Sequence, residues 1–243
     1  MSEVLLVQIS AFGNKRIKPE PGIITALMQE LIKLTGREFL PSVIPVPKLV
    51  VGEQKIALIS NLTFATADNS CQILCVDKRI DCAFNLEKKE QDSIEEKCRL
   101  GAQIVSYIMK QSDVIANRLA LNVNYDSNAC NGSTKFERQI IKVTSYYKKK
   151  RIVEWGNRVN GQTTVKIDGR NELLNVVTSY NCNRYKLPKD AEMKINCNAD
   201  INTVAENNDY RFKYDCMESF TLQVKQIFDK LYEDIEVLTN DSV

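Results

Sequence analysis

The sequence predicts an α+β fold in which antiparallel meanders pack against two helices in the N-terminal half and a long C-terminal amphipathic helix. Strand-like segments occur in consecutive groups, separated by segments with helical periodicity, as in α+β proteins. None of the nine glycines belongs to a Gly-rich turn from a strand into a helix, which disfavours a parallel dinucleotide-binding sheet. With 243 residues, of which 44% are hydrophobic, the chain can bury a substantial core.

The chain is expected to begin with a strand and a helix. Residues 4–9 form a short apolar run with β-branched members, which favours a buried strand. A helix follows Pro19 and Pro21 and ends at Gly36, because hydrophobic residues recur there at helical spacing. These residues are Ile24, Leu27, Met28, Leu31 and Leu34. The prolines that follow predict a connector through Pro41, Pro45 and Pro47.

Residues 55–64, 71–76 and 79–86 alternate between apolar and polar and predict an antiparallel meander. The first segment places Ile56, Leu58, Leu62 and Phe64 on one face. A capping box at residues 93–96 opens a second helix with the stripe Ile94, Cys98, Gly101, Val105 and Ile108. The strand that follows has Leu119, Leu121, Val123 and Tyr125 on its apolar face.

Residues 126–133 are polar and rich in Gly and Asn, which predicts a boundary between two halves, 1–126 and 134–243, of one compact unit. A capping box at residues 134–137 opens a short helix toward Tyr147. The dipeptides Asn160-Gly161 and Asp168-Gly169 favour type I′ turns, so residues 152–177 predict a three-stranded meander. A strand over residues 192–201 and an amphipathic helix over residues 217–235 complete the chain.

The chain contains no histidine. Histidine supplies most general bases and most nitrogen ligands of zinc, copper and iron. Its absence therefore excludes Ser-His-Asp and Cys-His nucleophiles, Cys₂His₂ zinc sites and His-ligated haem. Carboxylate, lysine and thiolate chemistry remain open, as does binding without catalysis.

Charge and cysteine usage favour a cytoplasmic protein. The 33 Lys and Arg nearly balance the 31 Asp and Glu, so no global field attracts nucleic acid or an anionic membrane. We expect no signal peptide and no membrane span. The eight cysteines lie within apolar alternation, so we expect them to be reduced and free of metal. A Cys₄ zinc site at Cys71, Cys75, Cys82 and Cys98 is disfavoured, because only the first two have suitable spacing.

Three stretches resemble a sporadically distributed family of uncharacterised bacterial proteins of similar length. Residues 71–86 are similar to its pair of strands that ends in Phe-Asn, and residues 118–125 to its strand after the second helix. Residues 191–201 and 217–236 resemble its closing strand and long helix. The resemblance covers about half of the chain, but departs from the family at the proline connector and at Asn160-Gly161. It implies one continuous α+β unit and assigns no catalytic residue.

The nearest approach to a catalytic motif is Asp168 followed by Glu192 and Lys194. An Asp and a Glu-x-Lys can hold Mg²⁺ and orient a water in metal-dependent nucleases. Asp168 is already required by its turn, however, and Glu-x-Lys is frequent by chance in a charged chain. We therefore expect that the three side chains do not converge.

Two surfaces are candidates for binding. A basic patch interleaved with aromatic residues could contact nucleic acid or cap a helix; it consists of Lys142, Tyr146, Tyr147, Lys148, Lys149, Lys150 and Arg151. Its acidic counterpart lies on the C-terminal helix, at Asp229, Glu233, Asp234 and Glu236. The polar sides of two strands could form one recognition surface or an ordinary wet sheet face; they carry Arg79, Asp81, Asn85, Arg118, Asn122 and Asn124.

These observations favour a non-enzymatic cytosolic binding or adaptor protein without a cofactor, acting in a larger bacterial assembly. The sporadic family suggests an accessory or phage-defence role by analogy. A protein partner is expected, and a homo-oligomer remains open. The alternatives are a Mg²⁺-dependent nuclease and a nucleic-acid-binding module that uses the basic patch.

Overall fold

A computed structural model describes residues 3–50, 55–86, 94–128, 154–183 and 194–240. The first half contains β1 (Glu3–Gly13), α1 (Pro21–Thr35), β2 (Leu40–Val50), β3 (Lys55–Ala65), β4 (Cys71–Val76), β5 (Arg79–Asn85) and α2 (Ile94–Gln111). The second half contains β6 (Ala116–Asn128), β7 (Glu154–Ile167), β8 (Arg170–Asn183), β9 (Lys194–Thr203) and α4 (Cys216–Asn240). The chain is therefore α+β, as the sequence predicts.

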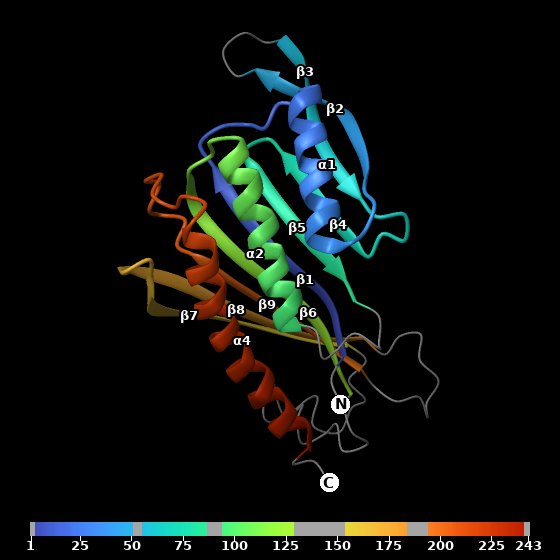
Figure 1. Cartoon of the computed structure of the whole chain (residues 1–243). Helices are drawn as coiled ribbons and strands as arrows, with labels where there is room; N and C mark the ends of the chain where they lie inside the picture. The colour runs from blue at the N-terminus through green and yellow to red at the C-terminus, as the bar shows by residue number, and fades with distance from the viewer. Residues whose placement is uncertain (1–2, 51–54, 87–93, 129–153, 184–193, 241–243) are drawn as a thin grey trace.

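The nine described strands form one antiparallel sheet in the order β2-β3-β4-β5-β1-β6-β9-β8-β7. The sheet continues across the two halves of the chain, because β6 pairs with both β1 and β9. The helices α1, α2 and α4 all lie on the same face of the sheet (Figure 1). No described helix is both long and apolar enough to cross a lipid bilayer.

The order of elements repeats in part along the chain. The first half runs strand, helix, four strands and helix, and the described residues of the second half form β6, the three strands β7, β8 and β9, and the helix α4. Within the sheet, β1 and β6 are neighbours, flanked by β5 and β9 and then by β4 and β8. The two halves are thus related by an approximate two-fold axis, which passes between β1 and β6 where Gln8 lies opposite Asn122.

The core lies between this sheet and the helices. Val7, Ile9 and Ala11 alternate along β1 and are at most 1% exposed, which places them on the helix-covered face. The apolar stripe of α2 packs against these residues of β1. Gly101 allows this close approach, since a Cβ atom there would lie 3.1 Å from Ile9 Cδ1 and 3.2 Å from Phe84 Cε2.

Several predicted elements are confirmed. The first strand, the helix that ends at Gly36, the β3-β4-β5 meander, α2 and the long α4 are all present. Gly36 is a left-handed C-cap with a φ of 66°. In β6, Leu119, Leu121 and Val123 are fully buried, as their alternation predicts.

The proline connector is wrong, because these residues form the edge strand β2, which pairs along its length with β3. Pro41, Pro45 and Pro47 are separated by even numbers of residues. The N–H groups that these prolines lack would therefore all point to the same side of the strand. That side is the outer edge of the sheet, where no neighbouring strand needs a hydrogen-bond donor. The second discrepancy is Leu58, which is 75% exposed rather than part of the apolar face, because the β2–β3 hairpin extends beyond the helices there (Figure 1).

The predicted turn at Asn160-Gly161 is also wrong. These residues lie inside β7, opposite Val177 and Val176 of β8. The Asp168-Gly169 turn is confirmed, with φ values of 49° and 76°. Because β8 offers an unbroken partner for all 14 residues of β7, the predicted three-stranded meander is one long hairpin that continues into β9.

Candidate functional site

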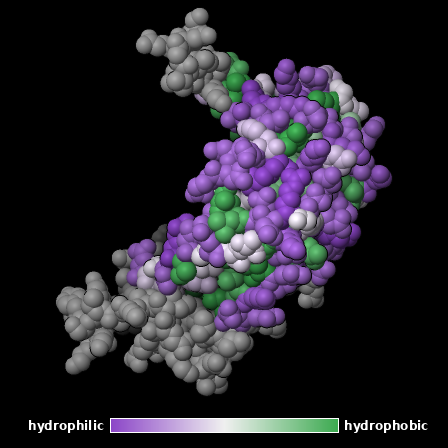
Figure 2. All heavy atoms as spheres, turned by 90° about the vertical axis from the view of Figure 1, so that its left-hand side faces the viewer, coloured by the Kyte–Doolittle hydropathy of each residue, from purple (hydrophilic) through white to green (hydrophobic). Residues whose placement is uncertain are grey.

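The face of the sheet opposite α1, α2 and α4 carries a polar surface at its centre, which we name the central face. Its residues come from four neighbouring strands, β5, β1, β6 and β9, and no described helix covers them (Figure 1). In the side view of Figure 2, hydrophilic residues dominate the described surface, and hydrophobic residues form only small patches. The central face comprises Gln8, Ser10, Phe12, Arg79, Asp81, Arg118, Asn122, Asn124, Asn198, Asp200 and Asn202.

The strand register arranges these side chains in rows, since directly opposed residues point to the same face of a sheet. The first row contains Arg79, Phe12 and Arg118. The second runs Asp81, Ser10, Ala120 and Asn202. The third runs Ala83, Gln8, Asn122 and Asp200, and the fourth joins Asn124 to Asn198.

Asp81 is the centre of a first hydrogen-bonded group on this face. The carboxylate is 6% exposed, and its Oδ1 accepts hydrogen bonds from Ser10 Oγ at 2.5 Å and Gln8 Nε2 at 3.1 Å. Arg79 Nε donates a third at 2.7 Å. A buried carboxylate needs such donors to offset its desolvation, so these side chains are held in fixed positions.

A second group occupies the equivalent position across the two-fold axis. Asn198 Nδ2 donates to Asn122 Oδ1 at 3.0 Å and to Asn124 Oδ1 at 2.6 Å. Asn198 lies opposite Asn124 as Asp81 lies opposite Ser10. The repeat thus presents the same triangular arrangement twice, once around a carboxylate and once around a neutral amide.

The first row ends this polar surface with two cations and an aromatic ring. The guanidinium carbons of Arg79 and Arg118 lie 5.0 and 4.8 Å from the centroid of the Phe12 ring. These distances are typical of cation–π contacts, which favour arginine. The ring therefore fixes both guanidinium groups beside the amide rows.

A hollow of about 660 Å³ lies where the rows continue toward the ends of β6, β9 and β8. Asp126, Asn196, Asn181 and Gly156 line it and are opposed in successive strand pairs. Asn196 Nδ2 donates to Asp126 Oδ1 at 3.2 Å. The polar surface therefore extends into a depression that could receive part of a ligand.

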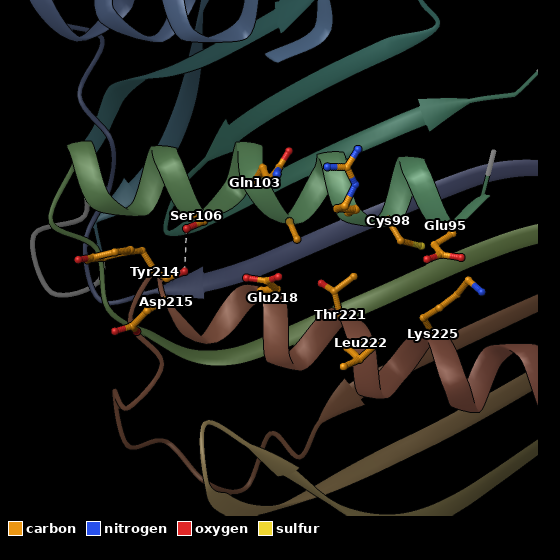
Figure 3. A pocket seen from close by; sticks show the side chains of 12 residues that line it. Glu95, Cys98, Gln103, Ser106, Tyr214, Asp215, Glu218, Thr221, Leu222 and Lys225 are labelled. Atoms are coloured by element: carbon orange, nitrogen blue, oxygen red, sulfur yellow. Dashed lines mark hydrogen bonds between the residues drawn. The ribbon is translucent and has the colours of Figure 1, made fainter. Parts of the chain in front are cut away.

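On the opposite side of the sheet, a groove of about 600 Å³ separates α2 from α4 (Figure 3). At one end of the groove, Ser106 Oγ donates a hydrogen bond to the Tyr214 carbonyl at 2.7 Å. Lys225 is paired with Asp229 at 2.7 Å, and the buried hydroxyl of Thr221 has no partner in the described residues. The groove presents both acidic and basic groups around a narrow apolar floor.

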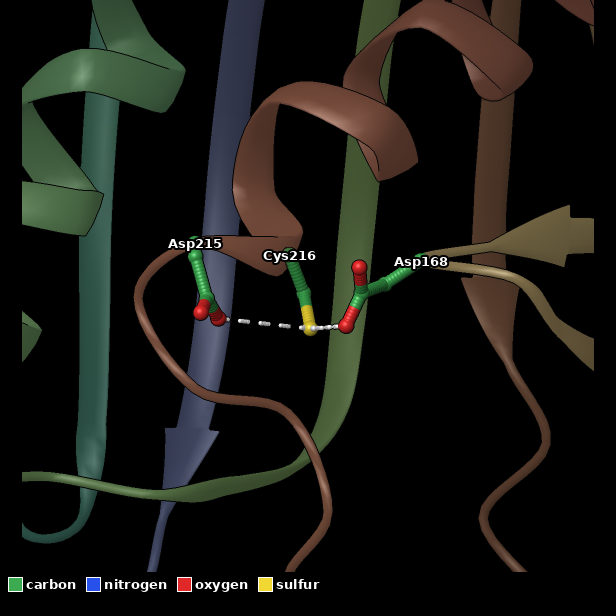
Figure 4. Close-up of side chains that lie close together, drawn as sticks. All are labelled: Asp168, Asp215 and Cys216. Carbon is green, nitrogen blue, oxygen red and sulfur yellow. Dashed lines mark hydrogen bonds between the residues drawn. The ribbon is translucent and has the colours of Figure 1, made fainter.

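A small acidic cluster lies where the β7–β8 turn meets the start of α4 (Figure 4). One ligand atom each from Asp168, Asp215 and Cys216 lies within 4.8 Å of the others. Burial is the main cause that raises the pKa of the Cys216 thiol, and both carboxylates add to it. A protonated thiol is a poor ligand for Mg²⁺, which prefers oxygen donors. The cluster therefore does not resemble a nuclease centre.

Buried cysteines line the core rather than a site. Seven described cysteines are buried with free thiols. Desolvation raises the pKa of Cys75 to about 12, with a smaller effect of the Asp81 charge. Burial likewise raises the pKa of Cys98 to about 12. These thiols therefore stay protonated at neutral pH.

The predicted site residues have different outcomes. Arg79, Asp81, Arg118, Asn122 and Asn124 come together on the central face. Asn85 lies on the same face, but its Nδ2 donates to the carbonyl of Asn69, in the turn between β3 and β4, at 2.7 Å. The basic patch at residues 142–151, Glu192 and the side chain of Lys194 lie outside the described residues.

Sequence reasoning missed the contributions of β1 and β9 to this face. Gln8 lies within the run 4–9 that predicts a buried strand, and Ser10 and Phe12 lie beyond that run, in the part of β1 that the sequence pattern does not predict. Asn198, Asp200 and Asn202 alternate with buried Ala199 and Ile201, a pattern that marks one polar strand face. Alternation alone could therefore have predicted the polar face of β9. The contribution of β1 could be recognised only from the order of the strands in the sheet.

The comparisons with known proteins add no relative: no protein-family model matches the chain, and no curated protein matches it significantly.

Proposed function

We propose that this chain is a non-enzymatic binding protein that recognises a partner protein through the central face. The observation that carries the proposal is the hydrogen-bonded arrangement around Asp81 and its counterpart around Asn198, on a sheet face that no described helix covers. Fixed polar groups reduce the entropy lost on binding, so such a surface is suited to recognition. Carboxamides also offer both donors and acceptors, as a polypeptide ligand requires.

The same proposal accounts for the location of the helices. The sheet face that α1, α2 and α4 cover forms the core. The opposite face carries amide, hydroxyl and guanidinium groups that are hydrogen-bonded to one another, which an ordinary solvated sheet face does not require. An adaptor role in a bacterial assembly, as an accessory or phage-defence component, extends this proposal by analogy with the resembled family.

The experiment compares two variants that gain the same side chain on opposite sides of the sheet. Ala83→Arg places a long cation on the central face, in the row of Gln8 and Asn122. Gln103→Arg places it on the exposed side of α2. Tagged proteins would be cross-linked in extracts of the native cells, and the captured proteins identified by mass spectrometry.

We expect at least one protein that the unchanged chain and Gln103→Arg capture at equal levels and that Ala83→Arg loses. Circular dichroism and thermal melting must show that both variants are folded. Equal capture of every protein by the two variants would refute a role of the central face in partner binding.

A further inference from the structure

Arg118 is the one charged group of the central face that lacks a polar partner among the described residues. Arg79 is paired with Asp81 at 2.7 Å, whereas Arg118 makes no hydrogen bond and no ion pair there. Its Nε is buried and unsatisfied, and its guanidinium stacks on Phe12 at 4.8 Å. A buried donor without an acceptor costs free energy. Arg118 as a whole is only partly buried, so a ligand can still reach part of its side chain.

The position of Arg118 indicates what such a ligand would be. The planar guanidinium is held against the ring, and no residue that the structure describes accepts a hydrogen bond from it. Such a group is suited to two parallel hydrogen bonds to a carboxylate or phosphate. The neighbouring rows also contain the carboxamides of Gln8, Asn122 and Asn202, which match peptide N–H and C=O groups.

The charges nearby distinguish the two kinds of anion. Asp81 and Asp200 lie in the next two rows, so a nucleic acid with a charge on every phosphate would meet carboxylates as it crossed the face. A polypeptide with one acidic side chain avoids this repulsion. We propose that Arg118 is the anchor for a carboxylate of the partner, whose polypeptide crosses the amide rows of the central face. This inference rests on the proposed function and names the chemistry of its partner.

The test uses the purified protein and defined peptides. The four rows run from Arg118 to Asn124 along β6, which is about 20 Å, so a blocked peptide of about seven residues can cross them. One peptide carries a single glutamate near one end, and its matched control carries glutamine. A short oligothymidine is the third probe. Binding is followed by calorimetry and by the NMR signal of the Arg118 Nε–H group.

We expect the glutamate peptide to bind and to shift the Arg118 signal, and the glutamine peptide to bind about tenfold more weakly, the loss of one charge-assisted hydrogen bond. Arg118→Gln should remove this difference, and Arg118→Lys should retain part of it without the planar fork. Arg99→Gln, on the helix side, should leave it unchanged.

Three results would overturn the inference: equal binding of both peptides, no shift of the Arg118 signal, or tighter binding of oligothymidine that depends on Arg118. Arg118→Lys keeps the cation over Phe12, so it provides a second test should Arg118→Gln not fold. Capture of a partner that Ala83→Arg loses and Arg118→Gln retains would keep the proposed function and reject the carboxylate anchor.

Discussion

At the scale of single residues, the β7–β8 hairpin contains two dipeptides with the same turn chemistry, and only one of them is a turn. Gly169 has a φ of 76°, a left-handed conformation that favours glycine. Gly161 is an extended strand residue, with open space where a side chain would begin. The difference arises from pairing, because the partner strand β8 continues past Gly161.

This contrast predicts opposite effects of the same substitution. Gly161→Thr should raise the free energy of unfolding by roughly 0.5–1 kcal/mol, because threonine suits a strand better than glycine does. Gly169→Thr should lower it by about 1–2 kcal/mol, the cost of a left-handed conformation for a residue with a Cβ. Urea denaturation of both variants measures these changes in the free energy of unfolding. A loss at position 161 as large as that at position 169 would contradict the continuous β7.

At the scale of elements, β2 shows how the sheet protects its edge. The strand exposes apolar side chains, including Leu40 at 66% and Ile44 at 47%. An exposed apolar edge with free N–H groups would pair with another chain. Three prolines on the outer side remove donors from that edge without breaking the ladder to β3.

Replacing both Pro45 and Pro47 with threonine should therefore promote self-association, because it restores two outward N–H groups. Light scattering over a range of protein concentrations would show a larger mass than that of the unchanged chain. Ile44→Thr is the matched control: it alters the same strand at a position whose N–H points toward β3. If the proline variant and the control scatter alike, the edge is protected in another way.

At the scale of the whole molecule, the buried thiols couple the stability of the core to alkaline pH. Burial raises the pKa of both Cys75 and Cys98 to about 12, from the ordinary value of 9.0 for a cysteine thiol. The unfolded chain loses these protons first as the pH rises. The stabilising contribution is therefore fully present below pH 9 and is lost between about pH 9 and 12.

We expect the free energy of unfolding to fall over this range, and to fall less steeply in Cys98→Ala. The variant should be less stable at pH 7, because it loses a buried side chain. The effect of the Cys98 thiol is the difference between the two proteins in the slope of the free energy of unfolding against pH, since all other titrating groups are common to both. Urea denaturation at several pH values measures it, and parallel curves would show that the Cys98 thiol contributes nothing.

The candidate face illustrates how far sequence reasoning extends. Alternation within their own strands predicts that Asp81 and Asn122 lie on a polar face, because one face of an antiparallel strand is polar when the other is buried. That alternation carries no information about which strands become neighbours. For this reason the sequence does not predict that Gln8 and Phe12 of β1 lie beside Asn122 and Arg118 of β6.

The sequence by itself determined the α+β class, most element positions, the Asp168-Gly169 turn and the exclusion of histidine chemistry, because these depend on local periodicity, turn propensity and residue type. Only the tertiary structure decided that Asn160-Gly161 is strand, that the proline segment is an edge, and that Arg118 meets Phe12 over the same face as Asp81. The first two features arise from pairing with the next strand along the chain, and the third from pairing between segments far apart in the chain. In each case the register is fixed by burying one face of every strand at once.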